Sequence, residues 1–209
     1  MDAFEAIHER RSVRRFKPDP VTREDIMQIV DAANWAPSAM NRQPWEFIAV
    51  SGEYLQKMGQ SFKTVIEPHL KEWDDKPDDG SSLSREGFLQ FAANYGNAPV
   101  VLVVLTKAEG EPRLHTADLE SASAAMENLL LAATALGLGT CWMTGPLLDS
   151  EYLRRLLAIP DDKTIVALTP LGYPAVVPKA PKRFDPELTQ KIRWVGNLPE
   201  FGGVKPDGA

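Results

Sequence analysis

Five cationic side chains crowd into eight residues near the N-terminus of a chain that is acidic overall. They are Arg10, Arg11, Arg14, Arg15 and Lys17, and Ser12 lies among them. Arginine offers bidentate donors to phosphate, and a serine hydroxyl adds another donor, so the cluster is suited to an anion pocket. On spacing alone, a solvated helix end whose cations complement the helix dipole remains an open alternative. The formal net charge of −6 disfavours a third interpretation, nucleic-acid binding.

A second candidate group lies between Ala36 and Trp45. Ser38, Asn41 and Gln43 are crowded onto a segment that Pro37 prevents from continuing a helix. A hydroxyl and two amides on an irregular segment suit the recognition of a polar heterocycle. The same three groups could instead cap the backbone of a helix terminus and turn, and the sequence leaves both interpretations open.

Metal sites and nucleophilic catalysis find little support in the sequence. The three histidines, His8, His69 and His115, have no ligand spacing to one another or to Cys141, which argues against a transition-metal site. The sequence contains no Gly-x-Ser-x-Gly elbow and no Walker loop. Gly137-Leu138-Gly139 lacks the third glycine of a dinucleotide fingerprint.

One acidic segment matches part of an EF-hand calcium loop. Counting from Asp75, the positions Asp79, Gly80 and Glu86 fit, but Pro77 stands where an oxygen ligand is needed. We therefore expect a solvated loop there and no calcium site.

Length and composition limit the class of protein. At 209 residues, with 44% hydrophobic and 25% charged residues, the chain fits one globular domain spanning 1–209. The single cysteine, Cys141, excludes an intramolecular disulfide and suits a reducing compartment. The N-terminus lacks the apolar region of a secretory signal, and no apolar run approaches the roughly 20 residues that span a bilayer. We therefore expect a soluble, cytoplasmic protein.

Capping residues and hydrophobic periodicity predict the helices that position these groups. Asp2 with Glu5 predicts a capping box that opens a helix through about Arg11, and Thr22 with Asp25 predicts the next helix. Further helices are expected at 53–70, at 118–136 and from a cap at Ser150. Residues 118–136 are apolar over much of the circumference, which predicts a central buried helix carrying Leu119, Ala122, Met126, Leu129 and Ala133.

The remaining pattern predicts strands, a loop and an arm. Strands are expected at 45–50, 100–105, 140–143 and 164–173, so the domain is of the α+β class. Residues 72–84 are polar and acidic and carry Gly, Ser and Pro, which predicts an exposed loop or lid. Residues 174–209 are rich in proline and lack periodicity, which indicates an extended C-terminal arm that wraps a surface, often a partner's.

These motifs together resemble the FMN-dependent nitroreductase family. Four stretches carry the resemblance in the family's order: Arg10-Arg11-Ser12-Val13-Arg14-Arg15-Phe16, Ala36-Pro37-Ser38-x-x-Asn41-x-Gln43-Pro44-Trp45, Gly137-Leu138-Gly139-Thr140-Cys141-Trp142, and Leu171-Gly172-Tyr173-Pro174 with Lys182-Arg183. With the alanine-rich helix they cover most of residues 1–185. The resemblance implies a three-layer α/β/α fold with a mixed, mostly antiparallel sheet. It also implies a homodimer with FMN at the interface, in which the arm wraps the partner subunit.

The resemblance implies a role for each matched position. A basic set would hold the FMN phosphate and ribityl chain, with Arg183 adding charge at the phosphate; that set is Arg10, Arg11, Ser12 and Arg14. A second set would approach the same flavin from the partner subunit: Pro37, Ser38, Ala39 and Asn41. Thr144 and Gly145 would lie along the N5 and O4 edge of the ring, and Gln43 would support the ring or be structural. Cys141 and Trp142 are predicted to be core residues, since both types are commonly buried.

The implied chemistry belongs to the flavin, with no catalytic side chain and no metal. NADH or NADPH would be the donor, and hydride would pass by a ping-pong mechanism to a small nitroaromatic or quinone-like acceptor. Relatives also perform reductive dehalogenation or ene-type reduction. The dehalogenases grip their substrate with a lid bearing glutamate, tyrosine and lysine. Glu67, Lys71, Glu72 and Lys76 are present here, but Tyr54 and Tyr95 do not complete that pattern cleanly. A non-catalytic flavin-binding protein is the alternative from another class.

Overall fold

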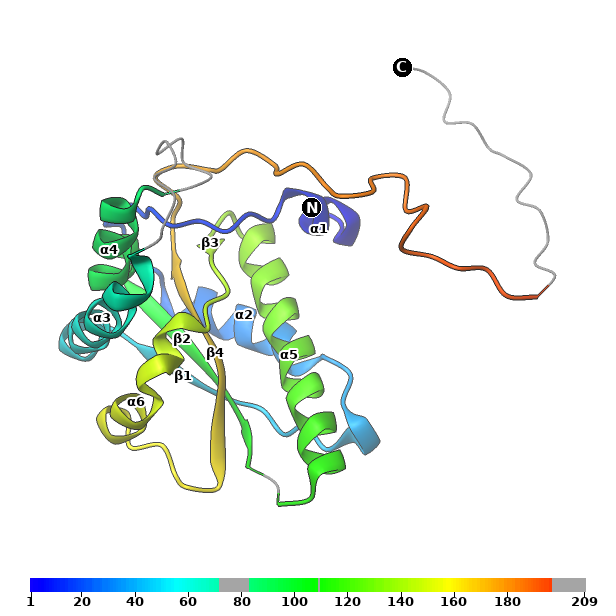
Figure 1. Ribbon diagram of the computed structural model, residues 1–209, viewed down its shortest axis with the longest axis horizontal. Helices are drawn as coiled ribbons and strands as arrows, with labels where there is room; N and C mark the ends of the chain where they lie inside the picture. The colour runs from blue at the N-terminus through cyan, green and yellow to red at the C-terminus, as the bar shows by residue number, and fades with distance from the viewer. Residues whose placement is uncertain (72–82, 109, 197–209) are drawn as a thin grey trace.

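A four-stranded antiparallel sheet in the order β1-β2-β4-β3 forms the middle layer of the computed structural model (Figure 1). The structure describes residues 1–71, 83–108 and 110–196. The strands are β1 (Glu46–Val50), β2 (Val100–Lys107), β3 (Gly139–Thr140) and β4 (Lys163–Gly172). Each pair of these strands is antiparallel, so the expectation of a mixed sheet is wrong for them. A parallel pairing occurs only as an isolated bridge, between Ser12 and Thr140, within the described residues.

Helices cover both faces of the sheet because its central strand is apolar on both. Along β2, Val101, Val103 and Leu105 enter one core with α3 (Gly52–Ile66), α4 (Arg85–Asn94) and α6 (Ser150–Leu156). The alternate residues Val100, Leu102 and Val104 enter a second core with α2 (Arg23–Asn34) and α5 (Pro112–Ala135). The predicted α+β class and three-layer arrangement are confirmed.

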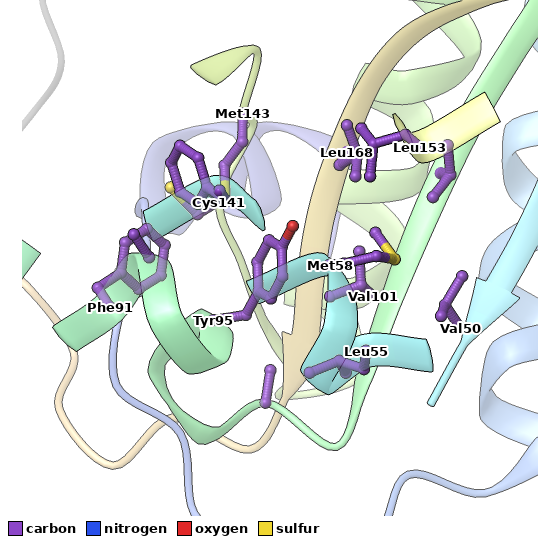
Figure 2. Packing of buried hydrophobic residues seen from close by; sticks show 14 of the residues in the cluster. Val50, Leu55, Met58, Phe91, Tyr95, Val101, Cys141, Met143, Leu153 and Leu168 are labelled. Atoms are coloured by element: carbon purple, nitrogen blue, oxygen red, sulfur yellow. The ribbon is translucent and has the colours of Figure 1, made fainter. Parts of the chain in front are cut away.

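The first core contains one polar atom with no partner. Figure 2 shows Tyr95 within this cluster near Met58, with its hydroxyl oxygen directed into the apolar packing. That oxygen has no hydrogen-bond partner among the described residues, and burial raises the pKa of the Tyr95 phenol. Tyr95 is therefore a neutral core residue, stacked on Phe62 with ring centroids 6.1 Å apart.

Predicted helix starts hold where a local capping signal exists. The Asp2–Glu5 capping box opens α1 (Ala3–Glu9), and Thr22 accepts a hydrogen bond from the backbone of Asp25 to open α2. By contrast, α5 begins six residues before the predicted start, because the Glu111 side chain caps the backbone N–H groups of Arg113 and Leu114. Helix α4 was not predicted at all. Ser150 is the first residue of α6 and not its cap, which is Asp149.

Some residues that were predicted to be buried are exposed in this chain. Leu119 lies on the outer face of α5, so α5 covers one face of the sheet and is not enclosed within the chain. Cys141 is buried as predicted, but Trp142 is 36% exposed, which contradicts its prediction as core. The strand expected at 140–143 is shorter, since β3 ends at Thr140 and Met143 makes only an isolated bridge to Leu168.

The predicted lid at 72–84 falls mostly outside the described residues. Leu83 is buried, and Ser84 caps α4 by accepting a hydrogen bond from the backbone of Gly87 at 3.1 Å. The partial EF-hand match likewise lies outside the described residues, except for Glu86 in the first turn of α4.

A left-handed turn after α4 fixes the backbone of the arginine cluster. Tyr95, Gly96 and Asn97 have φ values of 50°, 67° and 66°. Gly96 accepts a hydrogen bond from the backbone of Phe16 at 2.9 Å, and a Cβ on Gly96 would lie 2.2 Å from the carbonyl oxygen of Arg14. Glycine is therefore required at this position both by its φ and by the close approach of the two backbones.

Gly96→Ala should lower the free energy of unfolding by about 3–4 kcal/mol, because it adds overpacking against Arg14 to left-handed strain. Gly52→Ala is the matched control: Gly52 also has a positive φ, of 60°, but a Cβ on this glycine would have no neighbouring atom within 4 Å. Its loss should be about 1–2 kcal/mol. Urea denaturation of both variants measures the difference, and equal losses would contradict the close approach.

Candidate functional site

The basic residues near the N-terminus and the start of the C-terminal arm line one cavity of about 280 Å³. The N-terminal segment contributes Arg10, Arg11, Ser12 and Arg14, and the arm contributes Pro178, Lys179, Pro181 and Arg183. Five of the predicted site residues are thus brought together from opposite ends of the sequence. Arg10, Arg11 and Arg14 are half-buried, whereas Arg183 is exposed.

Positive charge exceeds negative charge at this cavity. Within the described residues, the only carboxylate at ion-pair distance from its four arginines is Glu127, with its Oε1 3.5 Å from Nε of Arg10. The Arg11 guanidinium donates to the carbonyl oxygens of His8 and Arg10 at 2.6 and 2.7 Å, and that of Arg14 donates to the carbonyl of Ser12 at 3.3 Å. Each guanidinium has five N–H donors, so further donors remain for a ligand. The arrangement favours the anion pocket over a solvated helix end.

The backbone that carries the arginines is held on two sides. The Val13 N–H donates to the carbonyl of Thr140 in β3 at 2.8 Å. On the other side, the Lys17 N–H donates to the Tyr173 carbonyl at 2.8 Å, and the Ala175 N–H donates to the Arg15 carbonyl at 2.9 Å. Strand β3 and the chain that follows β4 therefore fix the backbone from which the arginine side chains project.

Cys141 is a buried residue close to Ser12, Arg14 and Arg10. Burial raises the pKa of the Cys141 thiol, although Arg14, Ser12 and Arg10 act in the opposite direction. The thiol is therefore protonated at neutral pH and does not act as a nucleophile there.

The second predicted segment forms a short 3-10 turn, η1 (Ala39–Asn41), with strained backbone. Met40, Asn41 and Gln43 have φ values of 51°, 54° and 46°. The Ser38 hydroxyl accepts a hydrogen bond from the Gln43 N–H at 3.0 Å, and the Gln43 side-chain amide donates to Oδ1 of Asn41 at 3.0 Å. The Ser38 hydroxyl therefore caps the local backbone, in agreement with one of the two interpretations of the sequence, whereas the two side-chain amides bond to each other. Pro37, Asn41 and Gln43 are nevertheless exposed, so the turn presents its outer edge to a ligand or partner.

A buried ion pair, missed by the sequence analysis, anchors this turn to α5. The Arg42 guanidinium donates from Nε to Oδ1 and from Nη2 to Oδ2 of Asp118, both at 2.9 Å. Asp118 is 0% exposed. Hydrogen bonds from Arg42 hold the pKa of the Asp118 carboxyl below its usual value, against the opposing effect of burial. The available signal was an aspartate in the apolar face of the predicted helix.

The arginine cavity and the η1 turn contact different faces of α5. Arg10 contacts Glu127, and Arg42 contacts Asp118, which lies on the sheet-facing side. These two helix positions are nine residues apart, which is two and a half turns and about 13 Å along the axis. No residue of 37–43 lines the arginine cavity. The structure therefore does not bring the two predicted sets into one cavity within a single chain.

Thr144 and Gly145 begin the 3-10 turn η4 (Gly145–Asp149) and also lie outside the arginine cavity. Thr144 is exposed, and Gly145 lies directly against Phe62, whose Cε2 would be 2.9 Å from a Cβ on that glycine. A side chain at position 145 would therefore push Phe62 out of its place in the first core.

Neither a helix able to span a membrane nor a cluster of metal-ligating side chains occurs in the part of the chain that the structure describes. None of the described helices combines the length and the apolar character that crossing a bilayer requires. Among the same residues, no group of three or more His, Cys, Asp or Glu side chains is placed to hold a metal ion.

Comparisons with known proteins agree on a family. Residues 7–173 match the nitroreductase family. A Methanothermobacter thermautotrophicus protein, provisionally named NADH dehydrogenase/NAD(P)H nitroreductase, is 34% identical over 93% of this chain and 88% of its own length. An iodotyrosine deiodinase of Thermotoga neapolitana is 30% identical over 82% of this chain and 88% of its own length. A solved Desulfovibrio desulfuricans structure, provisionally identified as a nitroreductase in complex with FMN, superposes with a TM-score of 0.68 at 26% identity and covers 93% of this chain and 99% of its own.

Proposed function

The chain belongs to the nitroreductase family, and on this premise we propose that it binds FMN and reduces nitroaromatic or quinone-like acceptors with NAD(P)H. The cavity of four arginines supports this proposal. A terminal phosphate monoester carries close to two negative charges at neutral pH, and here only one carboxylate opposes the four guanidinium groups within the described residues. A solved relative in complex with FMN supports the identity of the ligand.

The residues of the chain have binding and positioning tasks in this proposal. When bound, FMN accepts a hydride and passes it to an acceptor, so the protein need not supply a nucleophile. Arg10, Arg14 and Arg183 hold the phosphate, and the Ser12 hydroxyl supplies a further donor. The neutral, buried thiol of Cys141 takes no part in the chemistry.

We infer further that the flavin site is shared between two copies of the chain. The arginine cavity and the η1 turn contact different faces of α5, so a second copy is needed to bring an η1 turn to each cavity. Large apolar side chains around these elements also lack cover: Trp35 is 80% and Met40 78% exposed, and Phe4 and Ile7 of α1 are exposed as well. Uncovered apolar side chains of this size are typical of an interface.

The C-terminal arm supports the same inference. Its described part, 174–196, first passes along the body of the molecule near α1 and then extends away from it in Figure 1. Phe184, Trp194 and Val195 on it are largely exposed. We propose that these side chains pack on the partner subunit.

Reductive dehalogenation is the second candidate, because an iodotyrosine deiodinase is 30% identical. The tyrosine positions argue against it. Tyr95 is sealed in the core and cannot reach a substrate, and Tyr54 lies on the outer face of α3, where Lys57 is 5.7 Å above its ring. Nitro or quinone reduction therefore remains the leading proposal.

The purified protein should be yellow and hold about one FMN per subunit, and Arg10→Ala and Arg183→Ala should each weaken FMN binding. Loss of one charge-assisted contact to phosphate costs about 1.5–3 kcal/mol, or roughly ten- to a hundredfold in affinity. Flavin fluorescence titration of the flavin-free protein measures this.

Lys17→Ala is the control, because Lys17 is basic and near in sequence but does not line the cavity. Equal losses for all three variants would indicate a diffuse electrostatic effect and not a defined pocket. Steady-state oxidation of NAD(P)H with a nitroaromatic acceptor separates an enzyme from a non-catalytic flavin-binding protein. A protein that remains colourless with micromolar FMN would refute the proposal.

Truncation after Arg183 should leave the arginine cavity intact but remove the apolar part of the arm. We expect a weaker dimer and poorer flavin retention, since the buried interface is smaller. Sedimentation velocity at micromolar concentrations measures the oligomeric state. A truncated chain that stays dimeric and yellow would show that the arm does not hold the partner.

A further inference from the structure

We propose that Asp118, acting through Arg42, is a positioning residue that sets the shape of the 37–43 segment and thereby its fit to the flavin. The anchoring of the segment follows from geometry, whereas its consequence for flavin rests on the proposed function.

The 37–43 segment needs an external anchor because its backbone is unfavourable. Met40, Asn41 and Gln43 all have left-handed φ values, and none of them is glycine. Such conformations persist only where the surroundings impose them. The local hydrogen bonds of Ser38 and Gln43 join one part of the segment to another, so they do not fix it relative to the rest of the molecule.

Helix α5 supplies two anchor points. At one point, Arg42 grips Asp118 with two parallel hydrogen bonds of 2.9 Å. At the other, the Ala39 N–H donates to the Ser121 hydroxyl at 3.2 Å. Met40 and Asn41 lie between the two anchored residues, Ala39 and Arg42, and Gln43 follows Arg42 directly. The contacts with α5 therefore hold the strained residues in place.

The Asp118 carboxylate is itself held rigidly. Its residue is fully buried on the sheet-facing side of α5, and its backbone carbonyl accepts a hydrogen bond from the Thr106 hydroxyl in β2 at 3.2 Å. Lys107 and His115 add to the favourable electrostatic surroundings of its negative charge. A buried ion pair contributes little net stability compared with apolar packing, but its two-point geometry fixes orientation. That property suits a residue whose task is to position a turn.

The first variant is Asp118→Asn, which keeps the shape of the side chain but removes the charge and one acceptor. The second is Arg42→Lys, which keeps the charge but removes the planar fork. Arg154→Lys is the matched control, since the Arg154 side chain is 18% exposed against 23% for Arg42. Arg154 also makes several hydrogen bonds, but to Pro160 and Lys163, far from the segment in the sequence.

Hydrogen exchange followed by mass spectrometry on the flavin-free protein tests the anchor without reference to catalysis. The N–H groups of Ala39, Asn41, Arg42 and Gln43 are all hydrogen-bonded in the structure. We expect their exchange to accelerate about tenfold or more in Asp118→Asn and in Arg42→Lys, with residues 12–17 unchanged. Arg154→Lys should leave the exchange of 37–43 as it is. FMN affinity should fall by about tenfold in the first two variants, equivalent to about 1.4 kcal/mol.

Unchanged exchange of 37–43 in both variants would overturn the inference. Faster exchange with unchanged FMN affinity would overturn it too, because the shape of the segment would then not matter to the flavin. A wild-type protein that fails to bind FMN would refute the proposed function, whereas the exchange rates would still decide whether Asp118 anchors the turn. If Asp118→Asn does not fold, Arg42→Lys carries the test, since it leaves a positive charge opposite the buried carboxylate.

Discussion

Repulsion among four guanidinium groups around one cavity is the force that the neighbouring parts of the fold must counter. A single carboxylate, Glu127, opposes them within the described residues. Like charges held close together repel one another and destabilise the fold. Other interactions must therefore hold the arginines in place, and a bound anion would offset their charge. The arginines are held in place because β3 and the chain after β4 bond to the backbone of residues 12–17. The close approach of Gly96 to Arg14 holds the same backbone from another side.

Helix α5 connects this cavity to the η1 turn, which is the second half of the proposed flavin site. One face of the helix contacts Arg10 through Glu127, and another holds the η1 turn through Asp118 and Ser121. The same helix packs on the sheet with an apolar stripe, so both polar contacts are fixed relative to one rigid element. If two copies pair so that the cavity of one meets the turn of the other, the positions of both halves are set by the packing of α5.

The sequence predicted what depends on neighbouring residues. The Asp2–Glu5 capping box, the Thr22 cap and the strands around 100–105 and 164–173 all have local signals, and the structure has them. The family resemblance also predicted that Arg10 and Arg183 lie close together, which no local pattern indicates. Both residues line the same cavity.

What depends on distant contacts was not predictable. The ion pair of Arg42 and Asp118 joins residues 76 positions apart, and an aspartate in an apolar stripe gives no sign of its partner. Leu119 and Trp142 were expected to be buried because of their residue types, but the single chain leaves both exposed. A partner subunit that covers them would reconcile residue type with exposure.

The most direct test of the shared flavin site is complementation between two differently damaged chains. One chain carries Arg10→Ala and the other carries Asn41→Ala with Gln43→Ala, and differently tagged mixed dimers are isolated and titrated with FMN. A shared site predicts that each mixed dimer regains one tight site, because one of its two flavin sites combines an intact cavity with an intact turn. If mixed dimers bind FMN no better than the two parent variants do, each site belongs to a single chain, and the proposal of a shared site is wrong.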